Sequence, residues 1–162
     1  MLPNKVLELL RENRLAHLGT CKDNVPSVSL MNFALIEADQ RFGSADGPVV
    51  VVATPENTQK YVNILANPKV SLLFHNSLRD EHPRKSLSEY LQSLNHCELT
   101  KRSVTLQGYA RVAEDEEAEY YRDVLLTREP ESKPFVQGAK IIVIELAGGA
   151  TLADALNHVE QF

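Results

Sequence analysis

Three side chains that could hold an anion lie close together in the middle of the chain. A valine-rich run ends at Thr54, and Thr58 and Lys60 follow where a helix is expected to begin. The first turn of a helix carries unpaired N–H groups and partial positive charge, so a lysine there is mildly unfavourable unless an anion lies nearby. Two hydroxyls, free N–H groups and an ammonium group suit a phosphate. From these residues alone, however, a capped surface helix with a solvated lysine is the simpler interpretation.

The segments around this stretch indicate a mainly β fold. Their β-branched or alternating composition predicts six strands, which are Leu15–Cys21, Val25–Ile36, Pro48–Thr54, Lys69–Asn76, Lys101–Glu114 and Ala139–Leu146. Asp23 and Asn24 are turn-forming residues between the first two strands, and Gly108 suggests a bulge or a close approach in the fifth. Loops or single short helices join most of the strands, so we expect an antiparallel, barrel-like sheet with flanking helices.

Helices and less regular segments complete a single predicted domain, residues 1–162. Amphipathic patterns predict helices within residues 1–14, 57–66 and 114–126. The polar segment 76–101 is interpreted as an insertion that contains a short helix. Gly148 and Gly149 are expected to end the last strand, and a C-terminal tail, residues 147–162, is expected to contain another short helix.

The overall composition excludes several classes of protein. With 162 residues, 43% hydrophobic residues and a net charge of −5, the chain is typical of a soluble globular domain and has no basic face for a nucleic acid. No apolar run is long enough for a signal peptide or a membrane span. The two cysteines, Cys21 and Cys97, lie far apart and are interpreted as free thiols in a reducing compartment. We therefore expect a cytoplasmic protein without a membrane or nucleic-acid partner.

The order of residues after the valine-rich run resembles the pyridoxamine 5'-phosphate oxidase family, whose members have an FMN-binding split β-barrel. In that family a strand ending in threonine is followed by Ser-Arg-Lys, a helix, Asn-Pro and another strand. The corresponding residues here follow without a gap and are Thr54, Thr58, Gln59, Lys60, Asn67 and Pro68. His17–Thr20 with Val25–Phe33 resembles the first hairpin of the same barrel, and Ser103–Val112 resembles its glycine-containing strand. The resemblance covers Leu15–Val112, with Ile141–Leu146 as the closing strand.

The resemblance implies a homodimer that binds FMN at the subunit interface, together with a small-molecule substrate of unknown identity. The cofactor phosphate would lie at a loop and helix start formed by Thr54, Asn57, Thr58, Gln59 and Lys60. The isoalloxazine ring would lie along the second strand, against Ser27, Val28, Ser29, Leu30, Met31 and Asn32. Ser103 stands where the family has a glutamine that contacts the flavin. A flavin ring needs polar partners along one edge and apolar cover on its faces, and this strand offers both.

Several cations of the true oxidase are missing. Its second strand has an arginine and a lysine where this chain has Ser29 and Ala34, and the arginine beside its phosphate-binding lysine is replaced by Gln59. The chain has no tryptophan, whereas the oxidase closes over its substrate with a C-terminal segment that contains one. The resemblance therefore implies weaker FMN binding, no pyridoxamine phosphate site, and a flavin-dependent oxidoreductase of unknown substrate. Since the cofactor performs the electron transfer, we name no catalytic residue.

Other interpretations stay open. The barrel could hold FMN without catalysis, could act as a cofactor-free interaction protein, or could bind a deazaflavin or a haem. A haem needs an axial ligand, for which His17 and His75 are the candidates near the barrel. The candidates to replace the missing cations are Lys69, Arg79 and Arg102. We predict no bound metal ion, because no zinc-site spacing occurs among His75, His82, His96 and Cys97.

Overall fold

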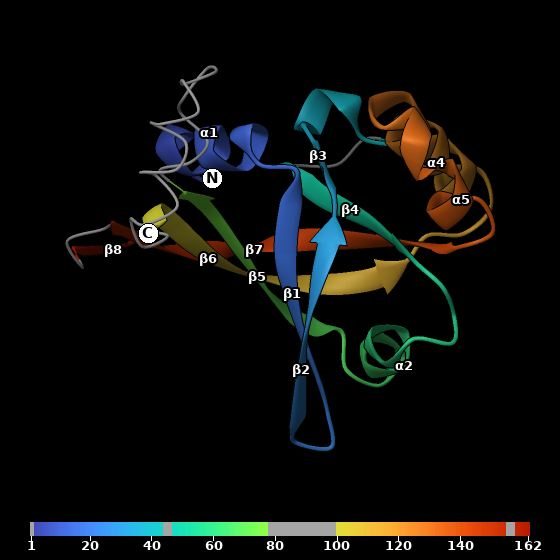
Figure 1. The fold of residues 1–162 in the computed structure, drawn as a ribbon, viewed down its shortest axis with the longest axis horizontal. Coiled ribbons are helices and arrows are strands. Elements are labelled where there is room, and N and C mark those ends of the chain that lie inside the picture. The colour runs from blue at the N-terminus through green and yellow to red at the C-terminus, as the bar shows by residue number, and fades with distance from the viewer. Residues whose placement is uncertain (1, 44–46, 78–99, 155–157) are drawn as a thin grey trace, which may run out of the picture.

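One antiparallel sheet forms most of the protein. A computed structural model describes residues 2–43, 47–77, 100–154 and 158–162. The strands in these ranges are β1 (Leu15–Lys22), β2 (Val25–Asn32), β3 (Ala34–Ile36), β4 (Val49–Thr54), β5 (Lys69–Ser77), β6 (Thr100–Val112), β7 (Lys140–Asp154) and β8 (Val159–Gln161). Seven follow the order β2-β1-β5-β6-β7-β4-β3, and β8 pairs with β7 (Figure 1). Because β2 and β3 are consecutive in the chain but lie at opposite ends of this order, the sheet curls into a split barrel.

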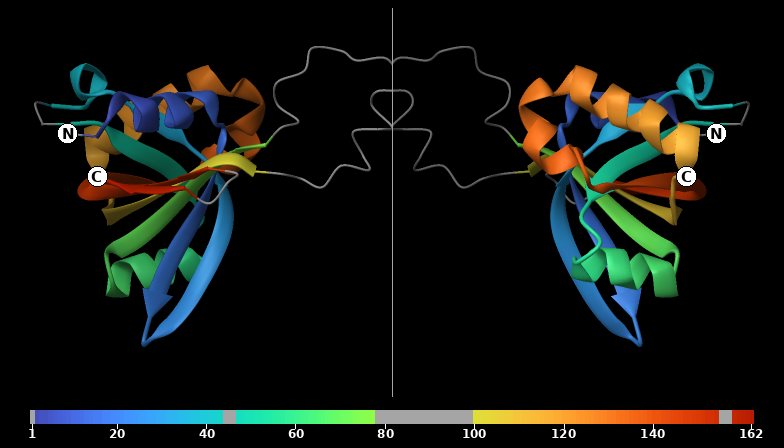
Figure 2. Two further views of the ribbon diagram at one scale, coloured as in Figure 1. Left: turned by 90° about the vertical axis from the view of Figure 1, so that its left-hand side faces the viewer. Right: turned by 90° about the vertical axis from the view of Figure 1, so that its right-hand side faces the viewer.

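Helices close the two ends of the barrel and cover one side of it. They are α1 (Asn4–Glu12), α2 (Gln59–Ala66), α4 (Asp115–Arg128) and α5 (Lys133–Val136), with short 3-10 turns η1 (Ala38–Gln40) and η3 (Pro130–Ser132). Figure 1 and Figure 2 show α2 at one end of the barrel, and α1 and α4 at the other. No helix in the described ranges has the length and apolar character needed to cross a membrane.

The valine-rich run of β4 is buried on both faces, which explains its composition. Val50 and Val52 belong to the cluster that fills the barrel, whereas Val49 and Val51 pack in a second cluster with α4 and α5. All four side chains have 0% exposure. A strand that is covered on both faces has a continuous hydrophobic sequence instead of an alternating one. The position of β4 in the middle of the fold fixes where the loop after Thr54 begins.

The prediction of six strands is wrong in number, because the predicted strand Val25–Ile36 is divided at Phe33. The ring of Phe33 turns into the barrel and lies 4.9 Å from the ring of Phe74, centroid to centroid. The residues before Phe33 pair with β1, and those after it pair with β4. The chain therefore crosses from one end of the sheet to the other at this residue.

The last strand is also longer than predicted. β7 continues through Gly148 and Gly149 to Asp154, because β6 is long enough to pair with these residues beyond the glycines. The predicted C-terminal helix is wrong for the residues described, which form β8 where a helix was expected. Phe162 exchanges backbone hydrogen bonds of 2.9 and 3.0 Å with Ala150, so the end of the described chain is paired with the sheet.

Other local predictions are confirmed. Asp23 and Asn24 have φ angles of 52° and 62°, the left-handed conformation that a tight β-hairpin needs. At Gly108 the register of β6 on β7 shifts, and a Cβ atom there would lie 2.7 Å from the carbonyl oxygen of Glu145. The helix predicted within the insertion 76–101 lies outside the described residues, and so does Arg79.

Candidate functional site

The loop between β4 and α2 is held in shape by two threonine hydroxyls. Thr58 donates its hydroxyl proton to the carbonyl oxygen of Pro55 at 2.9 Å, and its oxygen accepts from the Tyr61 N–H at 3.4 Å. The hydroxyl oxygens of Thr54 and Thr58 are 2.8 Å apart. Since a carbonyl can only accept, Thr58 has no second proton to give, and Thr54 must donate to it. Both hydroxyls are therefore engaged within the loop.

The helix begins two residues later than predicted, at Gln59. Thr58 is its N-cap, whereas Asn57 is exposed and lies outside the helix. The Tyr61 N–H is satisfied by this cap, but the N–H groups of Gln59 and Lys60 have no hydrogen-bond partner among the described residues. Two adjacent N–H donors at the positive end of a helix are the geometry that binds an anion.

Lys60 lies on the side of α2 that faces the barrel. It precedes Asn63 by three residues and Ile64 by four, and these two side chains are 2% and 3% exposed. Residues three and four apart share one face of a helix. Lys60 therefore lies on the same face of α2 as Asn63 and Ile64, at the start of the helix. Its side chain is half-buried and makes no ion pair or hydrogen bond with any other described residue. Lys60, half-buried and without a partner among the described residues, thus stands in the same helical turn as two N–H groups that also lack one there, an arrangement that suits an anion.

A second cation, which the sequence analysis missed, lies next to this loop. Lys140 is the register partner of Thr54 in the β4–β7 pair, and its Nζ is 3.2 Å from a carboxylate oxygen of Glu56. Of the predicted replacements for the missing cations, Lys69 begins β5 after the end of α2, and Arg102 pairs with Asn76 near the other end of that strand. Lys140 is therefore the cation placed beside Thr54.

Two linked hydrogen bonds, one partly buried and one buried, connect α2 to the β1–β2 hairpin. Gln59 donates from Nε2 to Oδ1 of Asn63 at 2.8 Å, and Asn63 donates from Nδ2 to Oγ1 of Thr20 at 3.0 Å. Thr20 lies opposite Ser27 in the β1–β2 register. The predicted site residue Gln59 is thus engaged with its own helix, and neither Asn63 nor Thr20 was foreseen as part of the site.

The six predicted residues of β2 do not share one surface. Ser27, Ser29 and Met31 are half-buried, whereas Val28 and Leu30 are 70% and 58% exposed and Asn32 is also exposed. Side chains alternate between the two faces of a strand, so only three of the six can face a given ligand. β2 pairs only with β1 among the described strands, which leaves one backbone edge open.

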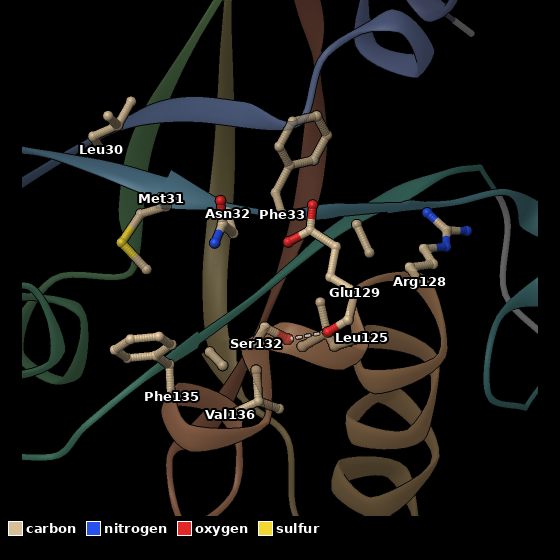
Figure 3. A pocket seen from close by; sticks show the side chains of 12 residues that line it. Leu30, Met31, Asn32, Phe33, Leu125, Arg128, Glu129, Ser132, Phe135 and Val136 are labelled. Atoms are coloured by element: carbon tan, nitrogen blue, oxygen red, sulfur yellow. Dashed lines mark hydrogen bonds between the residues drawn. The ribbon is translucent and has the colours of Figure 1, made fainter.

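A small cavity lies beside the end of β2. Its volume is about 170 Å³, and its lining includes Leu30, Met31, Asn32, Leu125, Ser132 and Phe135. Figure 3 shows Met31 and Phe135 near one another at this cavity, with the carboxylate of Glu129 directed toward Asn32 and Phe33. Such a volume is below the range of about 300–1,000 Å³ that holds a whole cofactor, so the cavity suits only a small molecule or part of a larger one.

Ser103 is not brought to the α2 loop within one chain. Val112 is the residue of β6 nearest in register to the end of β4, because both Val112 and Val52 pair with Ile142, and Ser103 lies nine residues from it, about 30 Å at roughly 3.3 Å per residue. On its other side Ser103 pairs with His75. The rings of His17 and His75 stack there, with centroids 5.4 Å apart, and both Nδ1 atoms are buried with no hydrogen-bond partner in the part of the chain that the structure describes. The predicted site residues therefore fall into two separate regions.

The family model for pyridoxamine 5'-phosphate oxidase matches residues 2–154. The chain belongs to the pyridoxamine 5'-phosphate oxidase family. A Saccharomyces cerevisiae protein described as a pyridoxamine 5'-phosphate oxidase homolog is 33% identical over 172 residues, which cover 90% of this chain and 86% of that relative. The family predicted from the residues around Thr54 and Lys60 is thus confirmed.

Solved structures with the same fold have different bound groups in their titles. A FAD-binding protein from Mesorhizobium loti has a TM-score of 0.64 and 16% identity, and the match covers 94% of both chains. A heme storage protein from Vibrio cholerae has a TM-score of 0.62 and 18% identity, covering 97% of this chain and 99% of that one. At these identities the comparison shows the fold alone, and it confirms the mainly β split barrel.

Proposed function

We propose that this protein binds FMN and acts as a flavin-dependent oxidoreductase whose substrate is not pyridoxamine 5'-phosphate. The observation that carries the proposal is the half-buried Lys60 in the same turn as the N–H groups of Gln59 and Lys60, none of which has a partner among the described residues. A dianionic phosphate would satisfy all three donors and would gain from the helix dipole. The two threonines shape the loop, and Thr54 could turn its proton from Thr58 to a phosphate oxygen.

The flavin ring would lie along β2, as the family resemblance implies. The open backbone edge of this strand offers N–H and C=O partners for the polar edge of the ring. The half-buried Ser27, Ser29 and Met31 supply small polar and apolar contacts on one face. The cavity beside Met31 and Phe135 would then lie next to the ring and could admit a small substrate.

A homodimer would bring Ser103 into the site. Ser103 is far from α2 in its own chain, so its contact with the flavin would have to come from the partner subunit. The outer face of the sheet supports this arrangement, because Leu30 and Leu73 both lie opposite His17 in the register and are 58% and 36% exposed. Tyr109 on β6 adds a further exposed ring at 51%. Apolar side chains gathered on an uncovered sheet face are typical of an interface.

FMN, when bound, would supply the electron-transfer chemistry, and the residues of this chain would hold and orient it. Lys60 and the N–H groups fix the phosphate, while β2 fixes the ring. The uncharged Gln59 stands where the true oxidase has an arginine, and Lys140 is neutralised by Glu56. The site thus has fewer free cations than that of the oxidase, which supports weaker FMN binding and a different substrate.

The visible spectrum of the purified protein tests this proposal. We expect flavin absorption bands that persist after gel filtration, and oxidation of a reduced nicotinamide in the presence of an electron acceptor. Bands without turnover would indicate a flavin-binding module that does not catalyse a reaction. A colourless protein that does not take up added FMN would contradict the proposal and would favour a cofactor-free interaction protein.

Haem is the second candidate ligand, and the stacked pair of His17 and His75 is the observation that favours it. Both rings lie on the partly exposed strands β1 and β5, and a histidine nitrogen is a common axial ligand of haem iron. The Vibrio cholerae protein with the same fold is a heme storage protein by its title. Titration with haemin distinguishes the two, since haem bound through a histidine gives an intense Soret band that His17→Ala or His75→Ala would shift.

A further inference from the structure

We propose that Asn63 is a positioning residue for the phosphate site. Its side chain joins the first turn of α2 to β1, and so fixes the direction in which Lys60 and the free N–H groups point. This inference rests on the proposed FMN phosphate site and adds to it a residue that touches neither the phosphate nor the ring. Asn63 acts through Gln59 on one side and through Thr20 on the other.

The geometry around Asn63 is that of a satisfied buried amide. Its side chain is 2% exposed and Thr20 is 4% exposed. The carbonyl end accepts from Gln59 at 2.8 Å, and the amino end donates to Thr20 at 3.0 Å. A buried amide is costly unless it is hydrogen-bonded, so both contacts restrict the orientation of the side chain strongly. An apolar residue would pack in the same place without fixing the orientation of α2 relative to β1.

Because α2 is short, a directional contact in its middle contributes strongly to its orientation. The helix has eight residues, and its buried residues are Asn63 and Ile64. A helix of two turns that is held by apolar contacts can rotate about its axis at little cost, because such contacts are not directional. Lys60 is three residues before Asn63, so any rotation of the helix would turn the ammonium group away from the end of the barrel. The hydrogen bond to Thr20 opposes this rotation from the middle of the helix, and Asn67 at the end of the helix adds a second one, from its Nδ2 to the carbonyl oxygen of Cys21 at 3.0 Å.

The same contact aligns the two parts of the cofactor site. Thr20 lies opposite Ser27 on β2, the strand proposed to line the flavin ring. Asn63 therefore ties the helix that would bind the phosphate to the hairpin that would bind the ring. The same side chain holds the amide of Gln59 toward the C-terminal end of the helix, away from the N–H groups of the first turn.

Paired binding measurements with FMN and riboflavin test the proposal, because the two ligands differ only by the phosphate. The variants are Asn63→Leu, which removes both hydrogen bonds, and Thr20→Val, which removes the acceptor while keeping the shape. Thr20→Ser is the conservative control, since it keeps the hydroxyl. Val104→Ala, a buried change on β6 away from α2, controls for a loss of stability that does not involve the site.

We expect Asn63→Leu and Thr20→Val to weaken FMN binding by about five- to tenfold, the effect of one or two hydrogen bonds, while riboflavin binding changes little. Thr20→Ser and Val104→Ala should keep the wild-type ratio of the two affinities. If both variants keep that ratio, Asn63 has no positioning role, whatever their stability. A wild-type protein that binds FMN no more tightly than riboflavin would contradict the phosphate site itself and this inference with it. If Asn63→Leu fails to fold, the ratio of FMN to riboflavin affinity in Thr20→Val alone decides whether Asn63 has a positioning role.

Discussion

The hydroxyl oxygens of Thr54 and Thr58 lie 2.8 Å apart and close the loop between β4 and α2. This contact explains why the chain leaves a buried strand through two threonines four residues apart. Thr54 is the last residue of β4, and its hydroxyl donates to the hydroxyl of Thr58. The Thr58 hydroxyl caps the helix and binds the carbonyl oxygen of Pro55. The shape of the loop is therefore set by contacts among its own residues, and the N–H groups of Gln59 and Lys60 stay without a partner among the described residues.

The cap should contribute measurably to stability. Thr58→Ala removes the acceptor of the Tyr61 N–H and the partner of Thr54, so we expect the free energy of unfolding to fall by about 0.5–2 kcal/mol. Chemical denaturation measures this change. Asn57→Ala is the matched control, because Asn57 lies outside the helix and is exposed. Equal effects of the two substitutions would show that Thr58 is not the cap.

The close approach of β6 and β7 at their register shift should not tolerate a side chain at Gly108. A Cβ atom there would lie 2.7 Å from the carbonyl oxygen of Glu145 and 2.8 Å from Cγ2 of Ile144. We expect Gly108→Ala to lower the free energy of unfolding by about 1–3 kcal/mol. Gly148→Ala is the control, since nothing lies within 4 Å of a Cβ atom at that position. Thermal unfolding of both variants checks the prediction, which fails if Gly108→Ala is as stable as wild type.

The ion pair between Arg111 and Glu117 should make stability depend on pH. Hydrogen bonds of 2.6 and 2.7 Å from Arg111, and then its charge, hold the pKa of Glu117 below its ordinary value, against the opposing effect of burial. Because the pKa is lower in the folded than in the unfolded protein, ionised Glu117 stabilises the fold above about pH 4.3. This contribution is lost as the pH falls through the folded pKa.

Glu117→Gln tests this linkage. The variant should be less stable than wild type at neutral pH, by roughly 0.2–1 kcal/mol for a pair that is partly open to solvent. The difference should shrink as the pH is lowered below about 4.3, the ordinary pKa of a glutamate, because the wild-type carboxylate becomes protonated. Free energies of unfolding measured above and below this pH check the slope. A difference that stays constant with pH would contradict the account.

The ion pair between Lys140 and Glu56 should limit how much Lys140 contributes to FMN binding. In Glu56→Gln the carboxylate is gone and Lys140 is free, so FMN binding should tighten by roughly two- to threefold at low salt. Lys140→Ala should have the opposite effect. Both changes should become smaller at high ionic strength, because exposed charges are screened. Titrations at two salt concentrations measure the effect, and affinities that do not respond to either substitution would show that Lys140 is remote from the phosphate.

The local part of the site could be predicted from the sequence, because its residues follow one another in the chain. Thr54, Thr58 and Lys60 belong to one loop and one helical turn, and their order is enough to place them. The roles of Thr20, Asn63 and Lys140 depend on which strand lies against α2 and on the register of β4 with β7. No short-range pattern encodes these contacts.

The strand boundaries that were predicted wrongly have the same cause. The strand-like pattern from Val25 to Ile36 gives no sign that Phe33 turns into the barrel to meet Phe74. Two adjacent glycines normally end a strand, but Gly148 and Gly149 lie within β7 because β6 continues beside them and β8 returns on the other edge. In both places, pairing with a distant segment outweighs the local preference.

The most direct test of the FMN site is a titration of wild type and Lys60→Ala with FMN, followed by flavin fluorescence. The account predicts that the substitution weakens binding about ten- to a hundredfold, as expected for the loss of a charged hydrogen bond from a half-buried group. Lys5→Ala, on α1 at the other end of the barrel, should bind FMN as wild type does and controls for net charge. Equal FMN affinities in wild type and Lys60→Ala would contradict the phosphate site at the start of α2.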